Sequence, residues 1–287
     1  MKNIIPVAIC PDNNYFVHAL ALALSILDNS NSDNFYKFYF CYRGIKNKNL
    51  KIIKNNIEKY TNASVYFIDF TKETEKFVTV SYVNSKSMFD RIFLCDVVQE
   101  DKIIYLDCDM ICVGDLSELF AQNIENKYLG VVRDRWVEEF AKNKSVQYIE
   151  TLPKLEQYKN WNYFITDFLK LKKITNYFNS GMLLMNLRKI REDKIKEKLI
   201  TFILENQPTP MPDQDAFNHI CKDCIQYLSP RFNFVLSTIN AFGSNDNYVV
   251  QATQSPVIIH HKFWNTPDFN TGYNQFYKKY LKKINKL

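Results

Sequence analysis

The sequence predicts an α/β protein with a mostly parallel central sheet. Up to Leu106, short apolar segments with β-prone residues alternate with segments of helical periodicity. This alternation is typical of a doubly wound sheet whose strands are joined by right-handed crossover helices. Acidic residues follow two of the expected strands, Asp12 after the first and Asp107 and Asp109 after the fourth. Ligands bind beyond the carboxyl ends of such strands, so a binding site is expected there.

The first half of the chain supplies the elements of this sheet in order. Strands are expected at 4–9, 35–42, 64–70 and 103–106, because each is a short apolar run. A turn at 10–14 offers Asp12 and its asparagine neighbours as helix caps and leads into a helix that continues to about Leu27. Further helices are expected at 49–60 and 88–98, and the second of these carries Arg91.

The second half is less regular. A short helix at 115–120 and a strand at 128–133 are followed by a charged, aromatic excursion at 136–173, which we expect to be a lid or an acceptor-binding flap. A buried strand at 176–187, a charged helix at 189–207, a helix opened by Asp213 and late strands at 226–234 and 256–261 complete the prediction. We expect one domain at 1–264, with a nucleotide-binding half at about 1–134 and an acceptor-binding and catalytic half at about 135–264, and a separate tail at 265–287.

Composition narrows the class of protein. The formal charge of +6 is modest and no nucleic-acid-binding motif is present, so we expect no nucleic-acid partner. Met1 leads directly into the first strand without a signal-peptide pattern, and seven cysteines form no regular framework. Cys221 and Cys224 stand alone as a Cys-x-x-Cys pair, which we do not expect to bind zinc. A reduced protein of the cytoplasm is expected.

The tail at 274–287 is predicted to be a basic amphipathic helix. Its apolar positions are Phe276, Tyr277, Tyr280, Leu281 and Ile284, set against Lys278, Lys279, Lys282, Lys283 and Lys286. Two interpretations are open. The helix either contacts an anionic membrane, placing the protein at the inner face of the cell membrane, or docks on its own domain.

The segment Asp107-Cys108-Asp109 holds the candidate metal ligands. Alternate residues of an extended chain point the same way, so both carboxylates can face one site with Cys108 turned away. Two carboxylates this close are tolerated when they are exposed or when a cation lies between them. We therefore expect a divalent cation with a diphosphate here. The alternative is an ordinary acidic turn.

Several motifs in a fixed order resemble one enzyme family. They are PDNNY (11–15), Arg91 upstream of the metal motif, YLDCDMICVGDLSELF (105–120), LGVVRD (129–134), YFNSGMLLMNL (177–187), PDQDAFN (212–218) and His260. Together they resemble glycosyltransferase family 8, which includes bacterial lipopolysaccharide galactosyl- and glucosyltransferases and glycogenin. The resemblance implies a GT-A, Rossmann-like nucleotide-sugar-binding fold. It also implies metal-dependent, retaining transfer of galactose or glucose from a UDP-hexose to a saccharide or lipid-linked saccharide acceptor.

The resemblance also implies roles for individual residues. Asp107, Asp109 and His260 match the ligands of Mn²⁺ (or Mg²⁺), although His261 follows directly. The residues matching the UDP site are Cys10, Asp12, Asn14, Tyr15, Asp107, Cys108 and Lys262. The catalytic groups around the donor sugar match Arg91, Asp134, Asn179, Asp213 and Gln214, the last nearest the anomeric carbon. Outside this family context, Arg91 reads as a surface ion pair, Asn179 as a turn residue and Asp213 as a helix cap.

The sequence departs from the family pattern at one place. The family has His, a short Gly-containing loop and then Lys-Pro-Trp, whereas this chain has His260-His261-Lys262-Phe263-Trp264, without Gly or Pro. Lys262 and Trp264 match that pair with a shortened loop. Two alternative functions stay open: a glycogenin-like self-glucosylating protein, and a catalytically inactive nucleotide-sugar-binding protein.

Overall fold

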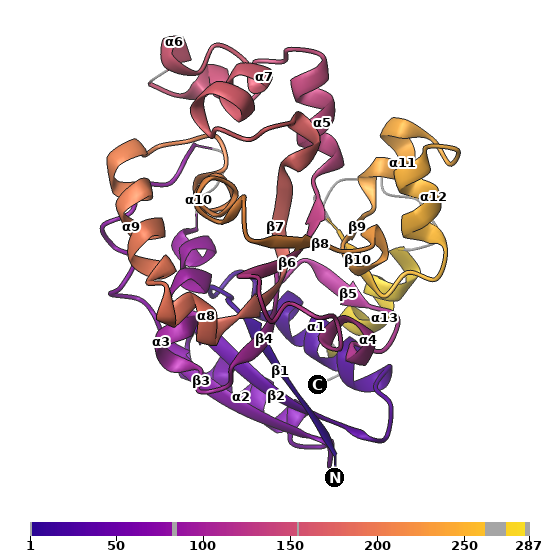
Figure 1. Ribbon diagram of the computed structural model, residues 1–287. Helices are drawn as coiled ribbons and strands as arrows, with labels where there is room; N and C mark the ends of the chain where they lie inside the picture. Colours follow the sequence, from indigo (N-terminus) through magenta and orange to yellow (C-terminus); the bar gives the residue numbers. More distant parts are fainter. Residues whose placement is uncertain (1, 82–84, 154, 262–273, 285–287) are drawn as a thin grey trace.

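A seven-stranded sheet forms the centre of the computed structural model, which describes residues 2–81, 85–153, 155–261 and 274–284 (Figure 1). Its order is β3 (Ala63–Asp69), β2 (Asn34–Tyr42), β1 (Asn3–Ile9), β4 (Lys102–Leu106), β7 (Phe178–Asn186), β6 (Leu129–Arg133) and β8 (Ile225–Tyr227). Every strand of this sheet except β7 runs in the same direction, because β7 is antiparallel to both β4 and β6. The mostly parallel sheet predicted from the sequence is confirmed.

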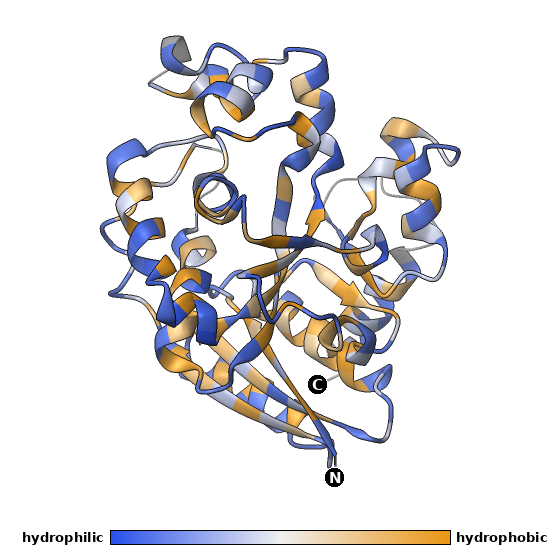
Figure 2. Cartoon of the chain, viewed as in Figure 1, coloured by the Kyte–Doolittle hydropathy of each residue, from blue (hydrophilic) through white to orange (hydrophobic). Residues whose placement is uncertain are grey.

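Helices cover both faces of the sheet. Side chains of β4 alternate between two hydrophobic clusters, with Ile104 and Leu106 in one and Ile103 and Tyr105 in the other. The first cluster lies under α1 (Phe16–Asp28), α2 (Asn47–Ile57) and α13 (Asn274–Ile284). The second lies under the 3-10 helix Lys86–Phe93, α3 (Leu94–Val97), α8 (Leu187–Glu192), α9 (Ile195–Asn206) and α10 (Pro212–Cys221). Figure 2 shows the strands as largely hydrophobic, and α1 is largely hydrophobic as well.

A small second sheet brings the end of the chain to the Asp107–Asp109 turn. It consists of β5 (Met110–Cys112), β10 (Ile258–His260) and β9 (Phe234–Val235), with α4 (Ser117–Phe120), α11 (Ser237–Phe242) and α12 (Asn247–Thr253) around it. β5 begins directly after Asp109, and antiparallel pairing sets His260 opposite Met110. The register of this sheet therefore places His260 next to the two carboxylates.

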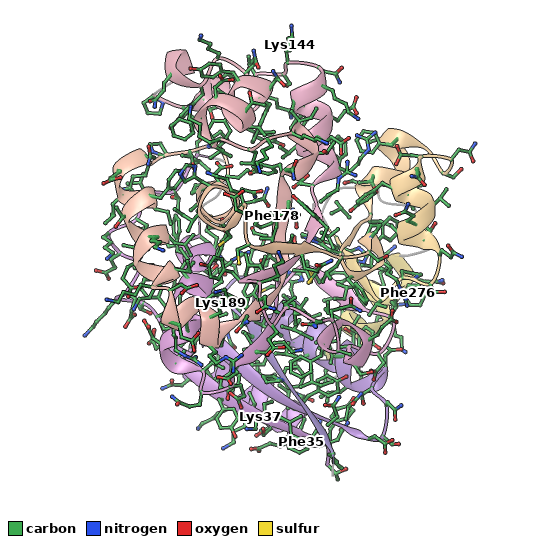
Figure 3. The ribbon with its side chains drawn as sticks, viewed as in Figure 1. Phe35, Lys37, Lys144, Phe178, Lys189 and Phe276 are labelled. Atoms are coloured by element: carbon green, nitrogen blue, oxygen red, sulfur yellow. The ribbon has the colours of Figure 1, made fainter. Side chains whose placement is uncertain are left out.

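The excursion after β6 is helical. It contains α5 (Arg135–Lys142), α6 (Leu155–Tyr158) and α7 (Trp161–Tyr163), and it forms the end of the molecule opposite the N-terminus (Figure 1). Trp161 and Phe164 are fully buried within it. In Figure 3, Lys144 projects from its outer tip, whereas Phe178, at the start of β7, lies in the interior.

Three predicted elements are divided differently in the structure. Residues 88–98 form a 3-10 helix followed by the short α3 rather than one α-helix. The helix expected at 189–207 is interrupted at Lys194, whose φ of 52° is left-handed. The late strand expected at 226–234 is broken by a 3-10 turn at Pro230–Phe232, because proline cannot donate a ladder hydrogen bond. The domain boundaries at 134 and 264 stay predictions.

The C-terminal helix docks on its own domain. Tyr277, Tyr280 and Ile284 are buried in the cluster that includes α1, and Lys283 pairs with Asp28 of α1 at 3.1 Å. The apolar side of α13 is therefore covered by the domain, as the second interpretation expects, and contact of the helix with an anionic membrane stays a prediction. Among the helices of the described ranges, none is long and apolar enough to cross a bilayer.

Candidate active site

A cavity of about 480 Å³ opens at the carboxyl ends of β1 and β4. This volume lies in the range of small-ligand sites. Its lining residues are Cys10, Asp12, Asn14, Tyr15, Ser85, Ser87, Met88, Arg91, Tyr105, Asp107, Cys108 and Asp109. The structure thus gathers the predicted UDP-site residues of the described chain around one cavity. Lys262 and Trp264 lie outside the described residues.

One wall is shaped by the turn after β1. Oδ1 of Asp12 accepts hydrogen bonds from the backbone N–H groups of Asn14 (2.8 Å) and Tyr15 (3.1 Å), which fixes the turn into α1. The Tyr15 side chain stays 38% exposed at the cavity rim. Ser85 and Ser87 also line the cavity, and they were not predicted as site residues. Ser85 caps the 3-10 helix by accepting from the N–H of Ser87 at 3.2 Å, and a serine before a helical segment was the available signal.

Asp107, Asp109 and His260 form a group whose ligand atoms lie within 4.8 Å of one another. Nε2 of His260 is 3.2 Å from Oδ1 of Asp109, whereas the ring of the adjacent His261 packs against Tyr277. The prediction of His260 rather than His261 as the third ligand requires the ring of His260 to lie beside Asp109, and the structure places it there.

Glycine at position 181 makes room for this group. A Cβ atom there would lie 2.7 Å from Cε1 of His260 and 2.9 Å from Oδ2 of Asp107. Two carboxylates and an imidazole around a space kept open by glycine fit a divalent cation of the Mn²⁺ type. Within the described ranges this is the one such ligand group, and Cys221 and Cys224 are free thiols outside it.

Arg91 connects the metal-ligand group to the other half of the site. Its guanidinium donates to Oδ1 of Asp107 at 2.8 Å and to the carbonyl of Ser180 at 2.5 Å, and it lies 3.4 Å from Oδ2 of Asp213. It stacks on the ring of Tyr105, whose hydroxyl also donates to Asp107. Arg91 is only 4% exposed, so the surface ion-pair interpretation is wrong.

The predicted donor-sugar residues share one buried hydrogen-bond network. Oδ2 of Asp134 accepts from Nδ2 of Asn179 at 3.0 Å and from Nε2 of Gln214 at 3.3 Å. Oδ1 of Asp134 caps α5 by accepting from two backbone N–H groups at its start. Asn179 lies inside β7 rather than in a turn, and Asp213 accepts from Ser180 rather than acting as a simple cap.

A residue that the sequence did not single out completes this network. Asn233 is fully buried, with Oδ1 3.0 Å from Nδ1 of His260 and Nδ2 2.8 Å from Oδ1 of Asn179. It lies in the apolar segment 226–234, which was predicted as a strand. A lone asparagine between two phenylalanines was the only sequence signal for it.

Two buried carboxyl groups near the site titrate far from their usual range. Burial raises the pKa of Asp215 to about 7 and that of Asp90 to about 8. Asp215 accepts from the hydroxyl of Tyr177, which also accepts from Nε2 of Gln214. Asp90 pairs with Arg43 at 3.2 Å.

Stability should therefore fall as the pH rises from 5 to 8. Both pKa values are raised in the folded state, so the folded protein holds protons that the unfolded chain has released, and this stabilisation is lost as pH passes through 7 and 8. Urea unfolding at several pH values checks this. Asp90→Asn and Asp215→Asn should each flatten the slope, and the exposed Asp33→Asn should not. Equal slopes in all four proteins would contradict the assignment.

The chain is similar to known proteins over most of its length. General stress protein A of Bacillus subtilis (strain 168) is 28% identical over 274 residues, covering 90% of this chain and 86% of that protein. A lipopolysaccharide 1,2-glucosyltransferase of Escherichia coli is 25% identical over 258 residues, covering 87% of this chain and 69% of that protein. The structure of galactosyltransferase LgtC, in complex with donor and acceptor sugar analogues, matches 97% of this chain and 96% of its own with a TM-score of 0.74 at 21% identity.

These similarities confirm the GT-A fold predicted from the sequence. The model of glycosyl transferase family 8 matches residues 6–267, which is most of the chain. The chain therefore belongs to glycosyl transferase family 8 and is a glycosyltransferase.

Proposed function

We propose that this protein transfers galactose or glucose from a UDP-hexose to a glycan acceptor, with retention of anomeric configuration and with a divalent cation. The acceptor class is a surface glycan such as lipopolysaccharide or lipooligosaccharide. The observation that carries this proposal is the group of Asp107, Asp109 and His260, whose two carboxylates line the same cavity as Asp12 and Tyr15.

The ligand chemistry favours Mn²⁺ over Mg²⁺. Two carboxylates suit either ion, whereas a neutral imidazole suits Mn²⁺ better. When bound, the cation supplies positive charge that offsets the charge developing on the leaving UDP. Arg91 adds a fixed positive charge beside Asp107, and its donors are directed by Ser180 and Asp107. Such preorganised charge is effective because the protein does not reorganise during the reaction.

We assign the remaining residues either to the UDP part or to the sugar part of the donor. We assign Asp12 and Tyr15 to the uracil end of the cavity, with Cys10, Asn14 and Cys108 lining the path to the diphosphate. We assign Arg91, Asp134, Asn179 and Asp213 to the donor sugar, whose hydroxyls need paired donors and acceptors.

Retention of the anomeric configuration is best explained by attack of the acceptor on the same face of the sugar from which UDP departs. Oε1 of Gln214 accepts hydrogen bonds from the N–H of Ser180 at 2.9 Å and from Nδ2 of Asn179 at 3.2 Å. These bonds engage the lone pairs of an amide oxygen that is already a weak nucleophile. Asp215 is fully buried and bonded to Tyr177, and Asp213 faces Arg91 and Ser180. A covalent intermediate therefore has no well-placed nucleophile, and the departing diphosphate takes the acceptor proton.

Gln214→Ala should keep a measurable fraction of transfer activity, about 1–10% of the unsubstituted rate, because the side chain positions rather than attacks. Initial rates at saturating donor and acceptor provide the measurement. A loss as large as that in Asp109→Asn would contradict same-face attack and favour a covalent role for Gln214.

A hydrolysis panel of UDP-sugars, each with Mn²⁺ and with EDTA, tests the proposed function. We expect turnover of UDP-galactose or UDP-glucose with Mn²⁺ and its loss in EDTA. Undiminished turnover in EDTA would overturn the metal assignment. Mass spectrometry of the protein after the same incubation would reveal hexose adducts if the chain glucosylated itself, and no turnover of any donor would favour an inactive binding protein.

We also propose that the exposed lysines of α13 contact an anionic membrane surface electrostatically, as suits an enzyme with a lipid-linked acceptor at the inner face of the cell membrane. Lys278, Lys279 and Lys282 are exposed, while the apolar side of the helix is covered. Changing these three to Gln should reduce sedimentation with phosphatidylglycerol vesicles at low salt, since each basic residue contributes about 1 kcal/mol at such a surface. Exposed Lys144, Lys172 and Lys173, changed together to Gln, provide the control. Equal binding by both triple variants would contradict the proposal.

A further inference from the structure

Asn233 lies between the two halves of the site and contacts both. It follows the 3-10 turn Pro230–Phe232 and precedes β9, and its carbonyl accepts from the hydroxyl of Tyr248 at 3.3 Å. Its side chain is 3.0 Å from Nδ1 of His260 on one side and 2.8 Å from Oδ1 of Asn179 on the other. The side chain is fully buried, and both of its polar atoms have protein partners, as buried polar groups normally do.

Asp134, Asn179, Asn233 and His260 form a series of hydrogen bonds, and the carboxylate at its start determines the direction of each bond. The carboxylate of Asp134 can only accept, so the NH₂ group of Asn179 faces it at 3.0 Å. Oδ1 of Asn179 then faces Asn233 and also accepts from the N–H of Gly181 at 3.0 Å. The amide of Asn233 must present its NH₂ group to that oxygen and its own oxygen to His260. His260 consequently carries its proton on Nδ1.

We infer that Asn233 is a positioning residue that fixes the tautomer of His260 and couples it to the donor-sugar residues. A proton on Nδ1 leaves the lone pair of Nε2 directed at the side of Asp109, where Oδ1 lies 3.2 Å away. Outer hydrogen bonds of this kind orient a metal-binding imidazole. Through Asn179, which also donates to Gln214 at 3.2 Å, the same network reaches the residues assigned to the sugar. The coupling to metal and sugar rests on the proposed function, whereas the tautomer does not.

Two substitutions of Asn233 distinguish its contact with His260 from its contact with Asn179. Asn233→Asp keeps an acceptor for Nδ1–H of His260 but sets an oxygen against Oδ1 of Asn179. Asn233→Leu removes both contacts at similar volume. Asn186→Leu is the matched control, since Asn186 is a buried asparagine at the far end of β7 that bonds to the carbonyls of Ile124 and Glu125.

The tautomer is read from ¹⁵N-histidine NMR of metal-free protein in EDTA, with His260→Gln identifying the resonances among four histidines. We expect His260 of the unsubstituted protein, Asn233→Asp and Asn186→Leu to carry a proton on Nδ1, and Asn233→Leu to lose this preference. Because no metal, substrate or activity is involved, this result is independent of the proposed function. A Nδ1-protonated His260 in Asn233→Leu would overturn the inference.

Mn²⁺ binding and transfer kinetics test the coupling. We expect Asn233→Leu to bind Mn²⁺ about 10- to 100-fold more weakly, and Asn233→Asp to bind within about threefold of the unsubstituted protein. Asn233→Asp should nevertheless lose about tenfold or more in kcat at saturating Mn²⁺, because Asn179 is disturbed. A purely structural role would lower the melting temperatures of all three variants and leave the Mn²⁺ affinity of the folded protein unchanged, which would overturn the coupling.

Discussion

Asp109→Asn should lower sugar transfer by about 10³-fold, the scale expected when a site loses an electrostatic stabiliser of the transition state. The substitution keeps the shape of the side chain but removes the charge that a hard cation prefers. In EDTA the variant should be at least as stable as the unsubstituted protein, since one of two neighbouring carboxylates no longer repels the other. UDP release at increasing Mn²⁺ concentration measures the first effect, and thermal unfolding in EDTA measures the second.

Asp101→Asn is the matched control for this substitution. Asp101 precedes β4 at the end opposite Asp107, its side chain is 65% exposed, and it forms an ion pair with Arg191. An exposed pair of this kind contributes little, so activity should be unchanged. If Asp109→Asn retained more than about a tenth of the transfer rate at low Mn²⁺, Asp109 would not be a metal ligand in this protein.

The metal-ligand group illustrates what the sequence could predict. Asp107 and Asp109 were placed at a sheet edge because β4 is a short apolar run that ends there, and local pattern is sufficient for that. His260 needed the resemblance, because its approach depends on the pairing of β10 with β5 across more than a hundred residues. No local pattern specifies such pairing.

Three other features could not be predicted from local sequence patterns, because they too depend on contacts between segments far apart in the chain. The apolar run of β7 is compatible with either strand direction when both faces are buried, so its antiparallel orientation was not predicted. The periodicity of α13 required an apolar partner but did not identify α1 as that partner. Asn233 was missed because a buried polar residue is defined by its partners, which lie far away in the chain.

Gly181→Ala should disrupt the metal-ligand group more than the addition of a single methyl group implies. The added Cβ would lie 2.7 Å from Cε1 of His260 and 2.9 Å from Oδ1 of Asn179 and Oδ2 of Asp107. None of these atoms belongs to the free end of a flexible chain. Arg91 and Tyr105 hold Asp107, Asp134 holds Asn179, and Asn233 holds His260. The strain must therefore appear as separation of the candidate ligands.

We expect Gly181→Ala to bind Mn²⁺ at least about 100-fold more weakly and to lose about 10²-fold in transfer, as small displacements at a reacting centre do. The free energy of unfolding should fall by about 1–3 kcal/mol, the usual range for an overpacked position. Gly130→Ala separates these effects, because its Cβ would meet Cδ1 of Leu228 at 2.9 Å in the core, away from the ligand group. That variant should lose stability and keep its Mn²⁺ affinity. Equal loss of Mn²⁺ affinity in both variants would show that general destabilisation, rather than the space beside Asp107 and His260, explains the requirement for glycine.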